Sequence, residues 1–266
     1  MNKYFEKTDR TCNYDKVKII ATVGKGGVGK TSLSAAFVRI LSETYPDKRI
    51  LAIDADPAIG LSTALGVEAE LTLDNLRKSI VDNVEKGNNR EAIEMLSEAR
   101  FRIFDAITEQ DGFSFIAIGR PETAGCYCKV NAYLKEVIEM ITKDFDYVII
   151  DGEAGIEQIN RRVMEKVTHL VLVTDASKKG IGVVNTIKDV ADELVMYDEH
   201  GIIINRAPDA FDLNNSGLSK DKVLAVIKND TDQTVNDMNG ESVYALKNDS
   251  ALLKGAKTSL EKLGII

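Results

Sequence analysis

The stretch VGKGGVGKTS, residues 23–32, decides the class of fold. It directly follows the apolar run IIATV, which reads as a buried strand, and it opens a helical pattern. Its residues match the spacing G-x-x-x-x-G-K-[ST] at Gly24, Gly29, Lys30 and Thr31. Glycines let successive backbone N–H groups converge on phosphate oxygens, and the positive end of the next helix adds to the attraction. The stretch therefore predicts a phosphate-binding loop.

The polar residues of this loop have separate expected tasks. Lys30 neutralises the β- and γ-phosphates, and the Thr31 hydroxyl can ligate Mg²⁺. Main-chain contacts to the nucleotide are expected from the remaining loop positions Gly26, Gly27, Val28 and Ser32.

Apolar, β-branched runs recur along the chain at regular intervals, at residues 17–23, 49–54, 113–119, 146–151, 169–175 and 201–205. Helical patterns lie between or after them, at residues 31–45, 72–110 (two helices), 130–143, 156–167, 179–196 and 219–228. Continuous apolar runs are typical of strands buried on both faces. The alternation predicts an α/β fold with a doubly wound, mostly parallel sheet flanked by helices. We expect a flexible N-terminal arm over residues 1–15 and a single domain over residues 16–266.

Composition excludes several classes of protein. The 266 residues carry a net charge of −8, which argues against general affinity for nucleic acid or anionic membranes. The chain has no run of eighteen apolar residues, so no membrane span is expected. The polar N-terminus lacks the apolar region of a secretory signal, and only three cysteines occur. These features predict a cytoplasmic protein.

A second lysine, Lys25, directly follows the first glycine of the loop, at the mouth of the phosphate site. With it, the string KGGVGKT resembles the deviant Walker A ATPases, the P-loop NTPase group of MinD, ParA and the nitrogenase iron protein. In that group the lysine reaches across a homodimer to the partner's nucleotide, as an arginine finger does in trans. The resemblance implies an ATPase that forms a homodimer, with Lys25 and Lys30 as catalytic cations.

Two further stretches resemble the switch regions of that group. In LAIDADPAIG, residues 51–60, Asp56 corresponds to the acid that orients or activates the attacking water, and Asp54 lies nearer the metal. In DYVIIDGEAGIE, residues 146–157, Asp151 corresponds to an indirect partner of Mg²⁺ and Gly155 lies near the γ-phosphate. Carboxylates at the carboxyl ends of parallel strands face the ligand crevice of an open sheet, so the two arguments agree.

The stretch IIINRAP, residues 202–208, resembles the adenine site of the group. The resemblance implies that the Asn205 amide pairs with the base, beside Arg206, and that ATP and ADP are the nucleotides. A later stretch, LAVIKNDTDQTV, resembles a segment whose backbone contacts adenine, which places Asp230 near the base. The group usually has proline where this chain has Lys228.

The remaining chemistry lies in GRPETAGCYCKVN, residues 119–131, which holds Cys126 and Cys128. A disulfide across one residue closes a strained ring, and a reducing compartment disfavours it. Two thiolates from one chain make half of a four-sulfur site, and a symmetric homodimer supplies the other half. Zn²⁺ suits a tetrahedral site, Ni²⁺ a square-planar one, and an iron–sulfur cluster also accepts four thiolates.

This pair resembles the interface motif of the CooC-type ATPases, which lies about two dozen residues before switch II. The resemblance implies Ni²⁺ or Zn²⁺ at the dimer interface, bound by Cys126 and Cys128. It further implies that the chain assists nickel insertion into a client enzyme of the carbon monoxide dehydrogenase or acetyl-CoA synthase type.

Other functions of the same ATPase core stay open. One is electron transfer as in the nitrogenase iron protein, although the stretch EQINRR after switch II lacks the second cysteine of that protein. Another is positioning as by MinD or ParA, in which the tail ALLKGAKTSLEKLGII would seek a membrane; a closing helix on the sheet explains its apolar spacing more simply. A synthetase of the cobyrinate diamide type is disfavoured because the chain has no room for a glutaminase domain.

Overall fold

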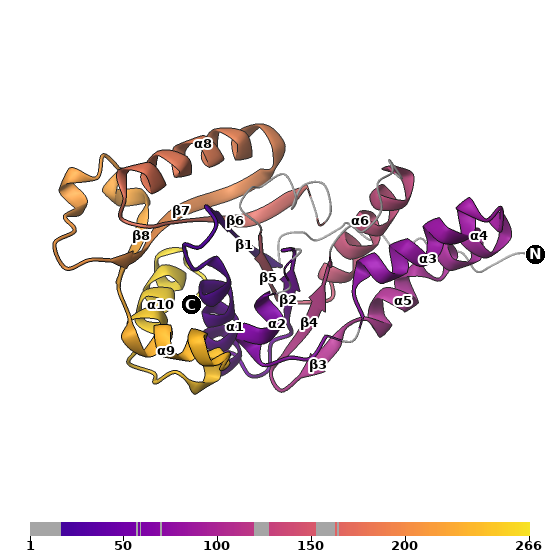
Figure 1. The fold of residues 1–266 in the computed structure, drawn as a ribbon, viewed down its shortest axis with the longest axis horizontal. Helices are drawn as coiled ribbons and strands as arrows, with labels where there is room; N and C mark the ends of the chain where they lie inside the picture. The colour runs from indigo at the N-terminus through magenta and orange to yellow at the C-terminus, as the bar shows by residue number, and fades with distance from the viewer. Residues whose placement is uncertain are drawn as a thin grey trace, which may run out of the picture.

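The computed structural model describes residues 17–56, 58, 60–69, 71–119, 128–152, 163 and 165–266, without the side chains of Asn89, Ala92, Cys128 and Lys129. The described residues form an eight-stranded sheet in the order β3-β4-β2-β5-β1-β6-β7-β8 (Figure 1). Its strands are β1 (Lys18–Gly24), β2 (Ile50–Asp54), β3 (Thr108–Gln110), β4 (Phe113–Ala117), β5 (Tyr147–Asp151), β6 (Lys166–Thr174), β7 (Met196–Ala207) and β8 (Val223–Lys228). All neighbours pair in parallel except β3 and β4. The expected α/β sheet is confirmed.

Helices cover both faces of the sheet, and each face has its own apolar core. One core packs the sheet against α1 (Lys30–Thr44), α2 (Gly60–Leu65) and α10 (Ala251–Lys262). The other packs it against α3 (Leu73–Glu85), α5 (Ala99–Asp105), α6 (Cys128–Thr142) and α8 (Lys178–Leu194). Side chains alternate between faces along a strand, so Ile19 and Ala21 of β1 join the second core and Ile20 joins the first. This explains why the central strands are apolar at every position.

The C-terminal tail forms α10, and its apolar side lies in the core. Leu253, Ala256, Leu260 and Leu263 are all buried. They pack with residues of α1 and β8. The interpretation of this tail as a closing helix on the sheet is confirmed.

The expected helix over residues 219–228 is wrong, because residues 223–228 form β8. This segment has a short, continuous apolar run, and such a run is compatible with either a helix or a fully buried strand. Parallel pairing with β7 decides between them. The strand is followed by a short helix, α9 (Thr231–Asn239).

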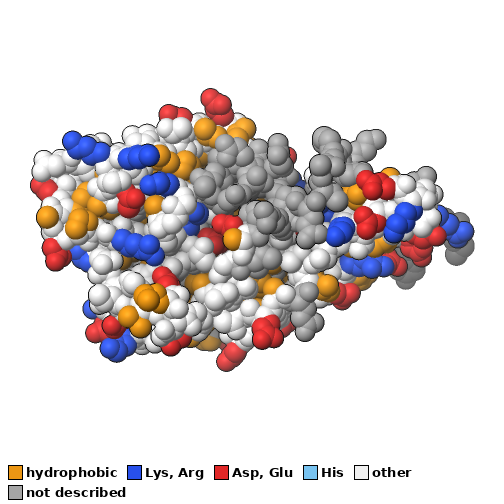
Figure 2. All heavy atoms as spheres, in the orientation of Figure 1, with side chains coloured by type: hydrophobic (Ala, Val, Ile, Leu, Met, Phe, Trp, Pro, Cys, Tyr) orange, Lys and Arg blue, Asp and Glu red, His pale blue; other side chains and the backbone are white. Residues whose placement is uncertain are grey.

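Residues 72–110 form three helices rather than two, followed by a strand. These are α3, α4 (Asn89–Ser97), α5 and the antiparallel edge strand β3. In Figure 1 α3, α4 and α5 form an arm beside α6 that extends away from α1. On the face shown in Figure 2, basic and acidic side chains are interspersed over this arm. The helices of residues 72–110 therefore lie beside α6 and do not cover α1.

Two other expectations concern the ends of the domain and the membrane. The N-terminal arm, residues 1–15, lies outside the described residues, and so does most of the helix expected over residues 156–167, whose last two residues belong to β6. In the part of the chain that the structure describes, no helix combines the length and apolar composition needed to cross a bilayer.

Candidate active site

The phosphate-binding loop joins β1, at the centre of the sheet, to α1. Gly24 has φ of 156°, and a Cβ atom there would lie 2.1 Å from the carbonyl oxygen of Val173 on β6. Gly29 caps α1 with φ of 90°, and its Cβ would lie 2.4 Å from Nδ2 of Asn205. Gly24 is therefore required by the close approach of strand backbone, and Gly29 is favoured by its left-handed conformation beside the Asn205 side chain, in addition to the phosphate argument.

We expect Gly24→Ala to lower the free energy of unfolding by about 2–4 kcal/mol, because the added methyl group meets backbone that cannot move aside. The urea midpoint of unfolding measures this loss. Gly26→Ala is the matched control, since a Cβ atom at Gly26 meets nothing within 4 Å. Equal loss in the two variants would contradict the argument.

The two lysines of the loop lie in different surroundings. Lys30 is buried, and its Nζ donates to the carbonyl oxygen of Lys25 at 3.3 Å. The Lys25 side chain is 42% exposed, and its Nζ lies 3.9 Å from Oδ2 of Asp175. Between them Gly26 and Gly27 are exposed, whereas Val28 is buried in the first core. Lys30 thus lies inside the loop and Lys25 at its surface.

Two buried carboxylates lie beside the loop at the carboxyl ends of neighbouring strands. Asp54 ends β2 and Asp151 ends β5, and the two are directly paired in the register of these strands. Oδ2 of Asp54 accepts from the Leu61 N–H at 2.8 Å, and Oδ1 accepts from the Asp56 N–H at 3.1 Å. The side chain of Asp54 is therefore held by the chain segment that follows it.

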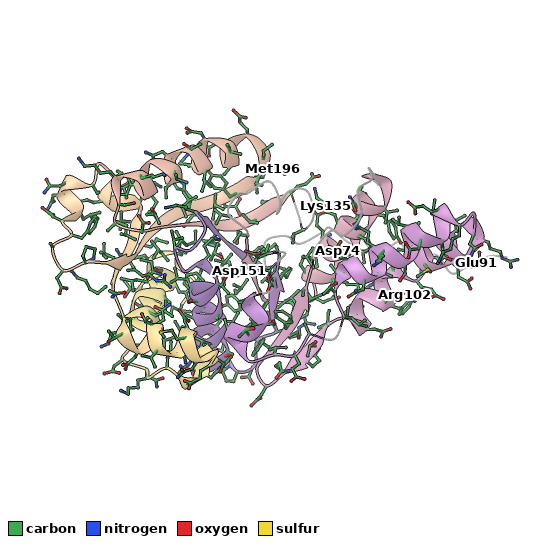
Figure 3. All side chains as sticks on the ribbon, in the orientation of Figure 1. Asp74, Glu91, Arg102, Lys135, Asp151 and Met196 are labelled. Carbon is green, nitrogen blue, oxygen red and sulfur yellow. The ribbon has the colours of Figure 1, made fainter. Side chains whose placement is uncertain are left out.

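Asp151, which is labelled in Figure 3, belongs to a network with hydroxyl groups of β1 and α1. Its Oδ1 accepts from Ser34 Oγ at 3.0 Å and from Thr22 Oγ1 at 3.3 Å. The hydroxyl oxygens of Ser34 and Thr22 are 2.6 Å apart, and Ser34 Oγ also lies 3.0 Å from the carbonyl oxygen of Lys30. The network ties β1, β5 and α1 together beneath the loop. Thr22 and Ser34 had not been expected from the sequence; the only signal was their position just before and just after the loop motif.

Burial makes both carboxyl groups poor acids. Burial, together with the neighbouring Asp151, raises the pKa of Asp54 to about 7, against the opposing backbone N–H groups of Leu61 and Asp56. Burial likewise raises the pKa of Asp151 to about 6, although the hydroxyls of Thr31 and Ser34 and the charge of Lys30 lower it. A cation placed here would stabilise the ionised forms of both groups.

The residues at this position fit Mg²⁺. Oδ2 of Asp151 is buried without a well-formed hydrogen bond to any described residue, while the Thr31 hydroxyl lies close enough to lower the pKa of the carboxyl group. Magnesium prefers hard oxygen ligands, and a hydroxyl and two carboxylates supply them. The expected roles of Thr31, Asp54 and Asp151 at the metal stay predictions.

Asp56 lies on the loop after β2 and is half-buried. Its Oδ1 accepts from the Ala58 N–H at 2.8 Å, which leaves Oδ2 for other partners. Its charge is close enough to raise the pKa of both Asp54 and Asp151. Three carboxylates therefore gather at the mouth of the loop.

The residues expected at the base lie beside the loop as well. Asn205 is buried, and its Nδ2 donates to the carbonyl oxygen of Val28 at 2.9 Å. Because an amide nitrogen has two N–H donors, one stays available for a base. Arg206 has a positive φ of 54°; its Nη1 donates to the Gly27 carbonyl oxygen at 3.2 Å, and its Nη2 lies 3.7 Å from Oδ2 of Asp237. Both residues thus brace the loop, and their contact with adenine stays a prediction.

Asp230 has a structural task that the sequence comparison did not indicate. Its Oδ1 accepts from the N–H groups of Asp232 and Gln233 and caps α9. Its Oδ2 accepts from the Ala251 N–H at 2.7 Å, at the start of α10. One carboxylate therefore joins two helices, and a contact of its backbone with adenine stays a prediction.

Cys126 and Gly155 lie outside the described residues, and Cys128 is described only as the first residue of α6. Among the residues with described side chains, no group of three or more His, Cys, Asp and Glu is arranged to hold a metal ion. The interface metal therefore stays a prediction.

Residues 17–198 match the AAA domain family, and the chain belongs to that family as an ATPase of the MinD/ParA type. It is 38% identical over 189 residues to an uncharacterised ATP-binding protein of Methanocaldococcus jannaschii, covering 71% of this chain and 74% of the relative. It is 31% identical over 220 residues to the carbon monoxide dehydrogenase accessory protein CooC of Rhodospirillum rubrum, covering 74% and 82%. The cell division ATPase MinD of Pyrococcus furiosus shares the fold, with a TM-score of 0.64 and 22% identity over 93% of this chain and 98% of that one.

Proposed function

We propose that this ATPase is a metallochaperone. In this proposal it binds nickel, or zinc, through Cys126 and Cys128 of two chains and assists nickel insertion into an enzyme of the carbon monoxide dehydrogenase or acetyl-CoA synthase type. The observation that carries the proposal is the position of Cys128 as the first residue of α6, in a stretch that follows β4 along the chain. Similarity to the CooC accessory protein supports the choice of client.

The cysteine stretch begins next to the carboxylates of the nucleotide site. The Ile118 N–H donates to the Asp54 carbonyl oxygen at 2.8 Å, and the Ile118 carbonyl oxygen accepts from the Asp74 N–H at 2.9 Å. Gly119 follows with φ of 85° and lies so close to Thr72 that a Cβ atom would be 2.6 Å from its hydroxyl. Movement of β2's end on hydrolysis would therefore reach Ile118, next to the start of the cysteine stretch, through the backbone hydrogen bond to Asp54.

In the proposed reaction each protein group acts on ATP from a defined place. The loop glycines and Lys30 would bind the phosphates, Thr31 would hold Mg²⁺ with Asp151 as an indirect partner, and Asp56 would orient the attacking water. Lys25 reaches the nucleotide of the partner. Mg²⁺, when bound, would neutralise charge on the phosphate oxygens. Asn205 and Arg206 hold the loop against β7, as their contacts to Val28 and Gly27 indicate.

The cysteine proposal is tested by metal analysis of the homodimer. With a non-hydrolysable ATP analogue, we expect the wild-type chain to bind about one nickel or zinc ion per two chains, since four thiolates complete one site. The Cys126→Ser/Cys128→Ser double variant should lose this ion, measured by elemental analysis, while light scattering follows the dimer.

Cys12→Ser is the matched control and should keep the metal, because it removes the third cysteine of the chain. Metal retained by the double variant would refute the interface site. Iron and sulfide in brown, anaerobically purified protein would instead indicate electron transfer of the iron-protein kind.

A positioning ATPase of the MinD kind is the second candidate, because the chain is also 28% identical over 219 residues to the septum site-determining protein MinD of Helicobacter pylori. The buried apolar side of α10 counts against membrane attachment through this helix. Sedimentation with anionic lipid vesicles in the presence of ATP distinguishes the two, since only the positioning ATPase would sediment.

A further inference from the structure

Both lysines of the phosphate loop are bound by groups of their own chain. Lys30 Nζ donates to the Lys25 carbonyl oxygen, and Lys25 Nζ lies 3.9 Å from Oδ2 of Asp175. Asp175 directly follows β6, on the other side of the loop from Asp54 and Asp151. The function proposed above gives this residue no task.

The carboxylate of Asp175 is held in place by its surroundings. Its Oδ1 accepts from the Ser177 N–H at 2.9 Å and from the Ser177 hydroxyl, and Ser177 in turn caps α8. A Cβ atom at Gly180 would lie 2.3 Å from Oδ1, so the first turn of α8 can approach this carboxylate only because it has glycine there. The Ser177 hydroxyl, and to a smaller extent Lys25, lower the pKa of Asp175. Oδ2 is thereby aimed at Lys25 while Oδ1 is fixed.

We propose that Asp175 is a positioning residue for Lys25, and that it holds this lysine on its own chain until the lysine enters the nucleotide site of a partner. The inference rests on the proposed homodimer, in which Lys25 acts in trans. One ammonium group cannot contact Asp175 and the partner's phosphates together, so each dimer that forms must break two such pairs. Asp175 therefore sets how readily the dimer closes.

The ion pair between Lys25 and Asp175 is weak enough for a partner's nucleotide to break it. Lys25 and Asp175 are 42% and 36% exposed, and ion pairs in such surroundings contribute little and are screened by salt. Polyphosphate carries more charge than one carboxylate, so it can displace Asp175. The Lys25 carbonyl oxygen also accepts from Lys30, and phosphate binding would draw Lys30 away. Nucleotide binding would then loosen Lys25 before the partner arrives.

The test measures dimer formation with a non-hydrolysable ATP analogue by light scattering. Each Lys25–Asp175 pair that need not be broken should raise the dimer association constant about 1.5- to 5-fold. A dimer has two such pairs, so Asp175→Asn should raise the constant about 2- to 25-fold at low salt. The increase should disappear near 0.5 M salt, at which the Debye length is about 4 Å. Asn keeps an oxygen for Ser177, and Asp175→Glu should restore the wild-type constant.

Asp192→Asn is the control, since it removes an exposed ion pair to Lys188 on the same helix and should leave the constant unchanged. An Asp175→Asn variant that dimerises as the wild type does, or less, overturns the proposal.

A second readout needs no dimer and separates this inference from the proposed function. In the monomer without nucleotide, the NMR signal of the Lys25 ammonium group should move in Asp175→Asn and stay in Asp192→Asn. An unmoved signal refutes the contact whatever the dimer does. A wild-type chain that stays monomeric with the ATP analogue refutes both the homodimer and the restraint of its closure by Asp175.

Discussion

Lys25→Gln is expected to lower the rate of ATP hydrolysis by about 10³-fold or more, the range in which a cation supplied in trans acts. Glutamine keeps most of the length of the side chain and loses its charge. Because Lys25 lies at the surface of the loop and Lys30 inside it, nucleotide affinity of the single chain should change by less than about threefold. Phosphate release and nucleotide titration measure the two quantities.

Lys48→Gln is the control for this prediction. Lys48 is 50% exposed and pairs with Asp146 at the opposite end of the strands. Its removal should leave hydrolysis unchanged. If Lys25→Gln abolished nucleotide binding together with hydrolysis, the lysine would act on its own chain's nucleotide, and the trans assignment would be wrong.

Asp151→Asn should change activity and stability in opposite directions. Loss of the carboxylate that fits Mg²⁺ should lower hydrolysis by about 10²-fold or more. In the absence of nucleotide and magnesium, the same change should raise the free energy of unfolding at pH 8 by about 1–3 kcal/mol, because it removes a buried charge. Hydrolysis assays and urea unfolding measure the two effects. A variant that loses both activity and stability would show that the hydroxyl network needs the charge.

The pH dependence of stability follows from the same two carboxyl groups. Their pKa values are about 7 for Asp54 and about 6 for Asp151 in the folded chain, against 3.8 for an unperturbed aspartate. Between these values the folded chain binds more protons than the unfolded chain, so their contribution to stability falls as the pH rises from about 4 to 7. Asp151→Asn should flatten this part of the profile.

Asp146→Asn is the control, because the contribution of Asp146 to stability should change with pH in the opposite direction. The Arg49 N–H and Lys48 lower the pKa of Asp146, so its charge stabilises the folded chain above the unperturbed value. This variant should lose more stability at neutral pH than at pH 3. Denaturant midpoints between pH 3 and pH 8 measure both effects. Equal shifts in Asp151→Asn and Asp146→Asn would contradict the opposite pKa directions of the two groups.

The central part of the fold could be predicted because its signals are local. The loop motif, the strand before it and the helix after it agree with β1 and α1 to within one or two residues. The continuous apolar strands indicated a parallel sheet, which is confirmed. The edges were predicted less well: β8 was taken for a helix, and β3 and α9 were missed. Short segments of this kind acquire their structure from the strand or helix against which they pack.

The residues of the site likewise divide into those that the sequence indicated and those that only the structure revealed. The loop motif indicated Lys30, and the resemblance of two later stretches to switch regions indicated Asp54 and Asp151. These residues meet at the carboxyl ends of β1, β2 and β5. Thr22, Ser34 and Asp175 carry no pattern of their own and became visible only through their contacts. Asp230 was expected near the base, which stays a prediction, and only the structure shows that its carboxylate accepts hydrogen bonds at the starts of both α9 and α10.

By itself, then, the sequence determined that the chain has a phosphate loop, a parallel sheet and two thiols one residue apart, because spacing along the chain is enough to specify these. Only the tertiary structure decided which charges are buried together and which lysine is restrained. The raised pKa values of Asp54 and Asp151 come from burial at adjoining strand ends, and Lys25 lies beside Asp175 because β6 is the neighbour of β1. Strand order sets those distances, and no local pattern encodes it.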